Sequence, residues 1–218
     1  MKKIPLAILI TLSSLSIFAQ EKVERKFKLG LTAHPNIGWI KSDMQEIKSD
    51  GARVGFSYGL LGDFYFTENY AFSTALQLSS INGRTKETLI GPADEIIPVN
   101  VSYKLQYLEI PTKIKLSTTE RKSIKFYGEF GIGNAFNIRA KQDIETENST
   151  IYQQKTDIYD DIYFYRASMI IGAGIEYNIG ENTNLTGGLT FNDGFTDIRN
   201  GSGTLKNSYL NFNLALYF

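Results

Sequence analysis

The chain has 218 residues, and its basic and acidic side chains are equal in number, 23 Lys and Arg against 23 Asp and Glu. This balance gives no electrostatic case for nucleic-acid binding. The absence of cysteine excludes disulfides, thiol catalysis and thiolate metal sites. A content of 14 Phe, 13 Tyr and 19 Gly against 5 Pro indicates a β-rich fold with tight turns.

Residues 1–19 have the pattern of a cleavable signal peptide. Lys2 and Lys3 give a basic start, an apolar stretch follows, and Ala19 precedes the expected cut before Gln20. The apolar stretch is short for a membrane-spanning helix, and no later apolar run is long enough for one. We expect residues 20–218 to form a single domain.

Eight segments alternate between apolar and polar residues, as strands do when one face meets lipid. The predicted strands are residues 26–40, 53–66, 70–83, 101–117, 123–140, 162–179, 184–198 and 207–218. Their connections are alternately short and long, and the two longest are residues 84–100 and 141–161. Outer-membrane barrels have short periplasmic turns and long outer loops. We therefore expect both termini on the periplasmic side.

The last predicted strand shows which face of the wall is apolar. Leu210, Phe212, Leu214, Leu216 and Phe218 share one side of it. Such a face would cause aggregation on an exposed sheet edge, but it suits the closing strand of a membrane barrel. The polar faces of other strands combine charges with glycines, which fits a narrow, filled lumen. The sequence thus predicts an all-β, eight-stranded antiparallel up-and-down transmembrane β-barrel rather than a soluble sandwich or a lipocalin-like barrel.

The most distinctive motif is Tyr107-Leu108-Glu109-Ile110-Pro111. A proline within a strand has no N–H for the ladder, so we expect a bulge or weakened pairing near Pro111. The motif resembles the Tyr-Leu-Glu-Ile-Pro hallmark of the PorT-like outer-membrane β-barrel family of Bacteroidota. Glycine-containing strings at residues 128–133, 172–177 and 194–198 extend the resemblance over the whole mature chain.

The resemblance implies an integral protein of the cell outer membrane, and the members that give the family its name are linked to type IX secretion and gliding machinery. It carries over no catalytic residue, because the shared motifs are architectural and fold alone does not transfer function. We expect a non-enzymatic structural, assembly or interaction role. The expected partners are outer-membrane lipid and lipopolysaccharide, the barrel-assembly machinery during insertion, and secretion or motility proteins.

Ten charged or titratable side chains point into the predicted lumen by strand parity: Lys28, His34, Arg53, Asp63, Glu109, Lys113, Lys115, Glu129, Arg166 and Glu176. A barrel of eight strands has room inside for little more than side chains. Such charges must then pair and hydrogen-bond. We expect a salt-bridged plug; the alternative is the polar path of a small-solute pore.

His34 is the only histidine, so a serine–histidine hydrolase would have to use it. A lipid-A-modifying outer-membrane enzyme is therefore a rival function, but no serine partner stands out and we expect no catalytic residue. The acidic residues of the 141–161 loop match no calcium-binding loop. The paired glycines lie within strands and complete no dinucleotide fingerprint. We expect neither a metal nor a cofactor.

Apolar side chains interrupt the polar 141–161 loop at four positions: Ile151, Tyr152, Ile158 and Tyr159. Surface loops on a rigid scaffold often carry function. These side chains are therefore a candidate docking site for a partner protein. The alternative is that they pack over the mouth of the barrel.

Overall fold

The computed structural model describes residues 27–91, 94–146, 151–180, 183–201 and 203–218, without the side chains of residues 151 and 152. The predicted signal peptide lies outside these ranges. Within them no helix is long and apolar enough to cross a membrane. The elements are β1 (Phe27–Ser42), β2 (Lys48–Tyr65), β3 (Tyr70–Ile90), β4 (Ile96–Glu109), β5 (Thr112–Ser117), β6 (Ile124–Thr146), β7 (Ile151–Asp157), the 3-10 helix η1 (Tyr159–Asp161), β8 (Tyr165–Asn178), β9 (Asn184–Gly194) and β10 (Leu205–Tyr217).

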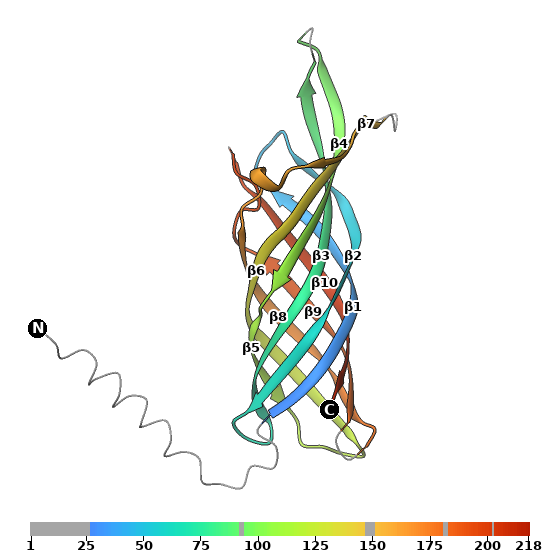
Figure 1. Cartoon of the computed structure of the whole chain (residues 1–218), viewed down its shortest axis with the longest axis vertical. Coiled ribbons are helices and arrows are strands. Elements are labelled where there is room, and N and C mark those ends of the chain that lie inside the picture. The colour runs from blue at the N-terminus through green and yellow to red at the C-terminus, as the bar shows by residue number, and fades with distance from the viewer. Residues whose placement is uncertain (1–26, 92–93, 147–150, 181–182, 202) are drawn as a thin grey trace, which may run out of the picture.

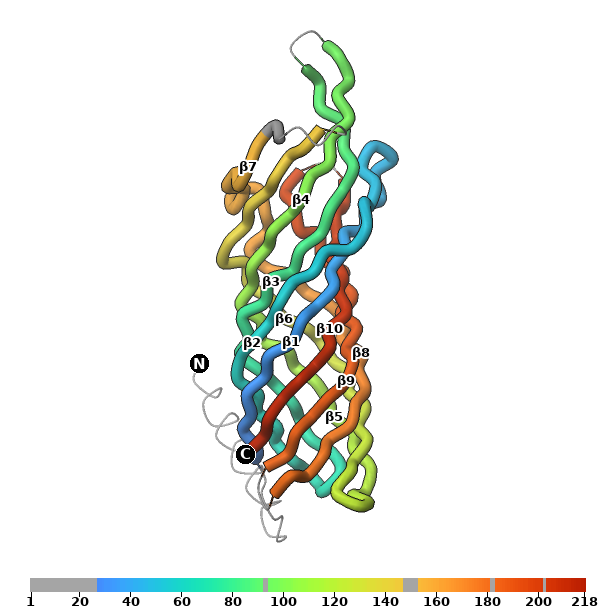
Figure 2. Tube along the Cα trace, turned by 90° about the vertical axis from the view of Figure 1, so that its right-hand side faces the viewer, coloured from blue at the N-terminus to red at the C-terminus, as the bar shows by residue number. Residues whose placement is uncertain are grey.

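The strands close into a ring of eight antiparallel positions, which confirms the predicted architecture. Neighbours in the ring are neighbours in the chain, and the ring closes where β1 pairs with β10. Figure 2 shows these two strands side by side along the wall. β4 and β5 share one position between β3 and β6, and β7 pairs with β6 outside the ring. A closed ring lets the backbone polar groups pair within the wall, which a lipid surrounding requires.

Pro111 interrupts the position that β4 and β5 share, which confirms the weakened pairing predicted there. Other bonds hold the chain across the gap. The Ile110 N–H donates to the carbonyl of Asn134 at 2.7 Å, and Thr74 Oγ1 donates to the carbonyl of Pro111 at 2.8 Å. The wall therefore stays closed at the break.

The outer surface of the wall is apolar from the end that carries the short turns, here called the short-turn end, to about the middle of the barrel. In β10 and at the residue after it, the side chains of Phe212, Leu214, Leu216 and Phe218 are exposed. Tyr217, Tyr209 and Ala215 alternate with them and are buried inside. β2, β6 and β8 show the same division, with their predicted apolar faces outside.

The two longest predicted loops are mostly strand, and here the prediction is wrong. β3 continues to Ile90 and β4 begins at Ile96, so residues 84–90 and 96–100 form the arms of a hairpin that projects beyond the rest of the barrel (Figure 1). In the 141–161 range β6 continues to Thr146, and β7 and η1 follow. Apart from Ile90, Ile96 and Pro98 near the tip of the hairpin, the outward side chains of the β3 and β4 extensions are polar, so the apolar band covers only part of each strand.

Towards the opposite end, here called the long-loop end, the two faces of the wall exchange character. Beyond Leu78 the outward side chains of β3 are polar: Ser80, Asn82, Arg84 and Lys86. At this end the inward side chains form a hydrophobic core that includes Ile40, Ile81, Val99, Val101, Tyr103, Leu105, Ala140 and Ile144. Burial of each large member stabilises the fold by about 1.5–3 kcal/mol. A polar exterior over an apolar interior is the arrangement of a water-exposed β-structure.

On β6, a β-bulge lies at the level where the outer and inner faces of the wall exchange polar and apolar character. The pairing of β4 with β6 shifts between Gln106 and Tyr107, and Arg139 of β6 is exposed outside instead of lying in the lumen as strand parity predicts. We name the part of the barrel beyond this level the platform; it comprises residues 80–90, 96–106, 139–146 and 158–162.

Candidate functional site: the lumen and the platform

Lys115 of β5 is the centre of a charged layer near the short-turn end. Its Nζ lies 2.9 Å from Asp63 Oδ2 and 3.3 Å from Glu176 Oε2. Lys28 Nζ lies 3.2 Å from the other oxygen of Glu176. Two aromatic rings flank the Lys115 ammonium, those of Tyr127 and Tyr217. The two positive charges of the lysines balance the two negative charges of the carboxylates. This matters because an unpaired charge enclosed in the lumen would destabilise the fold.

A second ion pair lies further into the barrel. Lys113 Nζ is 2.7 Å from Glu129 Oε2. Thr190 Oγ1 donates to the other oxygen of Glu129 at 3.0 Å, and the amide of Asn213 donates to Thr190. Both oxygens of Glu129 therefore have partners supplied by different strands of the wall.

His34 is buried, at 3% exposure, and its nearest polar partner is on its own strand. Its Nδ1 lies 3.1 Å from Thr32 Oγ1, which itself donates to the carbonyl of Leu214 at 2.9 Å. Because that hydroxyl has one proton, it must accept from His34, which places a proton on Nδ1. His34 Nε2 has no partner in the described part of the chain.

Glu109 of the Tyr-Leu-Glu-Ile-Pro motif accepts two short hydrogen bonds. Ser79 Oγ donates to it at 2.6 Å and the Tyr209 hydroxyl at 2.7 Å. The guanidinium of Arg166 lies over the Tyr209 ring, 5.3 Å from the ring centroid. That guanidinium donates to two asparagine side chains, those of Asn192 and Asn207. The motif thus ties β4 to β3 and, across the lumen, to β10.

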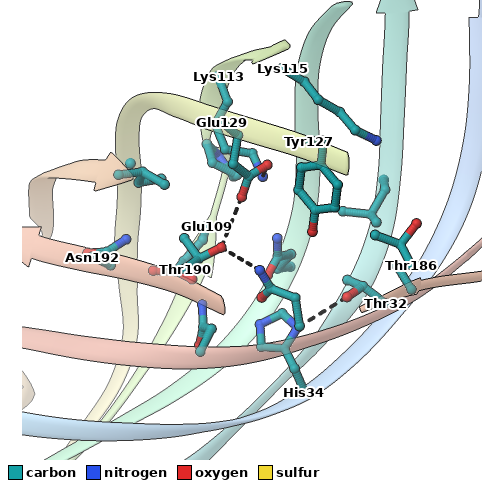
Figure 3. Close-up of a pocket in the computed structure, with 18 of the residues that line it drawn as sticks. Thr32, His34, Glu109, Lys113, Lys115, Tyr127, Glu129, Thr186, Thr190 and Asn192 are labelled. Carbon is teal, nitrogen blue, oxygen red and sulfur yellow. Dashed lines mark hydrogen bonds and ion pairs between the residues drawn. The ribbon is translucent and has the colours of Figure 1, made fainter. Parts of the chain in front are cut away.

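A cavity of about 60 Å³ remains between these groups (Figure 3). Polar atoms without protein partners in the described residues lie at its wall: His34 Nε2, Asn211 Oδ1 and Thr186 Oγ1. Since one water needs about 10–15 Å³ of such space, the cavity has room for about four waters. Its wall contains polar and apolar groups in similar measure, and it is too small for a metabolite.

The structure brings nine predicted lumen residues together: Lys28, His34, Asp63, Glu109, Lys113, Lys115, Glu129, Arg166 and Glu176. Arg53 does not join them. It is half-buried near the long-loop end of β2, and its Nη1 donates to the carbonyl of Ala52 at 3.1 Å. Above the charged groups the hydrophobic core of the platform closes the lumen.

The candidate docking loop is divided by the structure. Ile158 is buried in the core beside Ile162 and Ile198, so it packs over the mouth and offers no surface. Tyr159 is 41% exposed, and its hydroxyl donates to the carbonyl of Asn137. Two members of the set have side chains outside the described residues: Ile151 and Tyr152.

A polar cluster at the mouth was missed by sequence analysis. Tyr103 donates to Glu87 at 2.9 Å, and Arg199 Nη1 lies 3.2 Å from the Tyr103 hydroxyl and 3.5 Å from Glu87. Glu87 and Arg199 lie in predicted loops. The signal for this cluster was the inward alternation of Val99, Val101 and Tyr103, which marks 99–103 as strand.

Nothing in the described residues forms a metal centre: no group of His, Asp and Glu there could hold an ion. The lumen instead holds ion pairs and hydrogen-bonded charges beneath a hydrophobic seal, with Asp63 Oδ1 and Arg166 Nη1 left without a partner in the described residues. Each buried carboxylate is engaged by a lysine or by hydroxyl groups.

An apolar band outside, paired charges inside and a closed antiparallel ring define a transmembrane β-barrel. The chain belongs to the family described as outer membrane protein beta-barrel domain, whose model matches residues 18–200. It is therefore an outer-membrane protein. Among curated proteins, none matches the chain.

Solved structures of other barrels are similar in fold. Neisserial surface protein A is 13% identical, with 89% of this chain and 98% of that chain covered and a TM-score of 0.48. OprG of Pseudomonas aeruginosa is 10% identical, with 88% and 93% covered and a TM-score of 0.42. Ail, the attachment invasion locus protein of Yersinia pestis, is 10% identical, with 89% and 100% covered and a TM-score of 0.39.

Proposed function

We propose that this protein is a sealed, non-enzymatic barrel that anchors a folded protein-interaction surface, the platform, outside the cell. The observation that carries the proposal is the exchange of polar and apolar faces along the wall. β3, β4 and β6 continue past the apolar band as strands with a core of their own and with exteriors that are polar up to the hairpin tip at Ile90 and Ile96. A barrel that served only to cross the membrane would not need these extensions.

The proposal places the long-loop end outside the cell and both termini in the periplasm. Short periplasmic turns and longer outer segments are the usual arrangement in outer-membrane barrels. The first and last strands both have their terminal ends at the short-turn end. In this orientation the polar outer surface of the platform meets water, and the apolar band meets lipid and lipopolysaccharide.

A pore is disfavoured by the filling of the lumen. Lys115, Asp63 and Glu176 occupy its short-turn end, and the side chains of Ile81 and Leu105 occupy its long-loop end. The cavity between them is small. A solute would have to displace paired charges and an apolar core, which together stabilise the barrel.

A lipid-modifying enzyme is disfavoured by the position of His34. The side chain is inside the barrel, where no lipid reaches it. Within the described residues its hydrogen-bond partner is Thr32, and no serine is bonded to its ring. A hydrolase of the serine–histidine class needs a nucleophile within hydrogen-bond reach of the histidine and a path for its substrate.

The partner class follows from the resemblance of the Tyr107–Pro111 motif to PorT-like barrels. We infer that the platform contacts a component of a secretion or motility assembly, of the type IX and gliding class. The barrel-assembly machinery would contact the chain only during insertion. The assignment of the partner to a secretion or motility assembly depends on that resemblance. The interaction role itself depends on the structure of the platform.

Cross-linking in intact cells tests the interaction role. A membrane-impermeant amine reagent should reach Lys86 and Lys104, which are 55% and 50% exposed, but not the buried Lys113 and Lys115. We expect a discrete adduct with another envelope protein. The matched control is the double variant Lys86→Arg and Lys104→Arg, which keeps both charges and loses both amines, and should lose the adduct.

Two results would overturn the proposed role. Stable single-channel conductance of the purified protein in planar bilayers would make it a pore. A change in lipid A composition that is abolished by His34→Gln, with folding and membrane level unchanged, would make it an enzyme.

A further inference from the structure

The platform ends in a two-stranded ribbon that extends past its neighbours (Figure 1). It consists of residues 87–90 of β3 and 96–99 of β4, with Ile90 opposite Ile96. In the described residues β2 pairs with β3 only as far as Lys86, and the pairing of β6 with β4 ends at Val99. Each strand of the ribbon therefore has one side that no other described strand covers.

The hydrogen bond at the turn shows which residues point to the uncovered side of β3. The Gly91 N–H donates to the carbonyl of Glu95 at 2.8 Å, which makes these two residues a hydrogen-bonded pair. Bonded and non-bonded pairs alternate along an antiparallel ladder. Thr88 and Ile90 are therefore in non-bonded pairs, and their N–H and C=O groups point away from β4. These groups form an open strand edge.

The corresponding edge of β4 is blocked. By the same alternation Pro98, which lies opposite Thr88, turns its backbone away from β3. Proline has no N–H to donate, and proteins use it to protect edges from unwanted pairing. The ribbon thus has one protected edge and one edge that can still accept a strand.

The ribbon also has two highly exposed apolar side chains, one of them on the open edge. Ile90 is 79% exposed and Ile96 is 74% exposed, more than any other large apolar side chain described. Between Ile90 and the last apolar outward residue of the membrane band, Leu78, lie 12 residue steps of strand with polar outward groups. At about 3.3 Å per residue this is a contour of about 40 Å, so lipid of the same membrane does not cover the ribbon.

We propose that a β-strand of a different protein adds to β3 at Thr88 and Ile90. Strand addition gives affinity through main-chain hydrogen bonds and specificity through alternate side chains. The incoming strand would carry an apolar residue beside Ile90, which would extend the Ile90–Ile96 pair into a three-stranded apolar face. This inference deepens the proposed function and rests on it, because it requires the platform to face outward.

A pair of variants at one position isolates the backbone contribution. Thr88→Pro removes the edge N–H without removing a bond within the ribbon, whereas Thr88→Val keeps the N–H and the β-branched shape. With a photoreactive amino acid at residue 90 in living cells, we expect one adduct whose yield falls about tenfold in Thr88→Pro and is retained in Thr88→Val. Heat-modifiable gel mobility and surface level should be equal in both.

The position of the probe gives a second readout. A photoreactive residue at position 98, on the blocked edge, should give at least about tenfold less of the adduct. Peptide mapping should place an extended segment of the other protein beside residue 90. An adduct with a second copy of this chain, equal adducts from positions 90 and 98, or full yield in Thr88→Pro would each overturn the inference.

The controls separate this inference from the proposed function. Adducts at Lys86 and Lys104 that persist in Thr88→Pro, without any adduct at residue 90, would leave the interaction role standing and reject strand addition. If every platform position fails to give an adduct in cells, both are rejected.

Discussion

Lys115 Nζ and Asp63 Oδ2 are 2.9 Å apart in the lumen, and both side chains are enclosed, with exposures of 2% and 0%. The pair joins β5 to β2, two strands that are not neighbours in the wall. Lys115 also reaches Glu176 of β8 at 3.3 Å. One ammonium group therefore holds three strands of the barrel in register.

Removing this ammonium should destabilise the barrel strongly. Lys115→Met leaves Asp63 and Glu176 buried with less compensation, and we expect the free energy of unfolding to fall by about 3–5 kcal/mol. Lys104→Met is the matched control: Lys104 is half exposed and paired with Asp143, so the loss should stay within about 1 kcal/mol. Denaturant unfolding in detergent micelles measures both. Equal, small losses would show that the charged layer does not hold the strands.

The close approach of β5 to β6 gives a second prediction. A Cβ added at Gly131 would lie 2.1 Å from the Thr112 carbonyl oxygen, whereas one at Gly187 would meet nothing within 4 Å. We expect Gly131→Ala to destabilise by about 1–3 kcal/mol, because overpacking must displace backbone. Gly187→Ala should be nearly neutral under the same unfolding assay. A neutral Gly131→Ala would mean that the wall beside Pro111 can widen.

The hydrophobic core of the platform should resemble that of a soluble protein. Leu105 is buried within it, so Leu105→Ala should cost about 2–5 kcal/mol through lost transfer free energy and a cavity. Leu214→Ala removes the same atoms from the outer apolar band, where detergent or lipid fills the space. We therefore expect a smaller loss for Leu214→Ala in the same micelles. The reverse order would contradict the assignment of the two faces.

Cysteine labelling tests the level of the membrane and the orientation together. The natural chain has no cysteine, so single variants report one site each. On intact cells an impermeant maleimide should label Ser102→Cys on the platform. It should label Glu68→Cys, in a short turn, only after the membrane is permeabilised. Leu78→Cys, in the apolar band, should stay unlabelled in both cases. Labelling of Glu68→Cys on intact cells would reverse the proposed orientation.

The loop after β1 should loosen in acid. The Thr204 N–H donates to Asp43 Oδ1 at 2.8 Å, and this hydrogen bond lowers the pKa of the Asp43 carboxyl below its ordinary value of 3.8. A lowered folded-state pKa means that the contribution is complete above the ordinary pKa and is lost as pH falls through the lowered one. We expect protection of the Thr204 amide to decline below about pH 4. Asp43→Asn should remove this pH dependence; unchanged behaviour would assign it to another group.

Several features could be predicted from residues alone, because they depend on local periodicity. Period-two alternation of large apolar residues predicted the ring of eight, and the missing N–H of Pro111 predicted the break in its strand. Strand parity also identified most of the lumen charges. Arg53 is half-buried near the long-loop end and does not meet the other lumen charges, and the bulge on β6 leaves Arg139 exposed outside.

The length of the strands could not be predicted by the same rule. Residues 84–100 and 141–161 resemble loops because most of their outward side chains are polar, yet Val99 and Ile144 face a common core. An alternating pattern has the same form whether the apolar face points out to lipid or in to a core. Only the placement of both faces in three dimensions distinguishes the two cases.

The sequence by itself determined that this chain closes into an outer-membrane barrel, since the side-chain period and turn spacing are local properties of consecutive residues. The tertiary structure alone decided which charges meet across the lumen, that Ile158 is buried while Ile90 and Ile96 are exposed, and where one edge of β3 remains open. Those features depend on the register between strands far apart in the chain, and register is set by the packing of the closed ring.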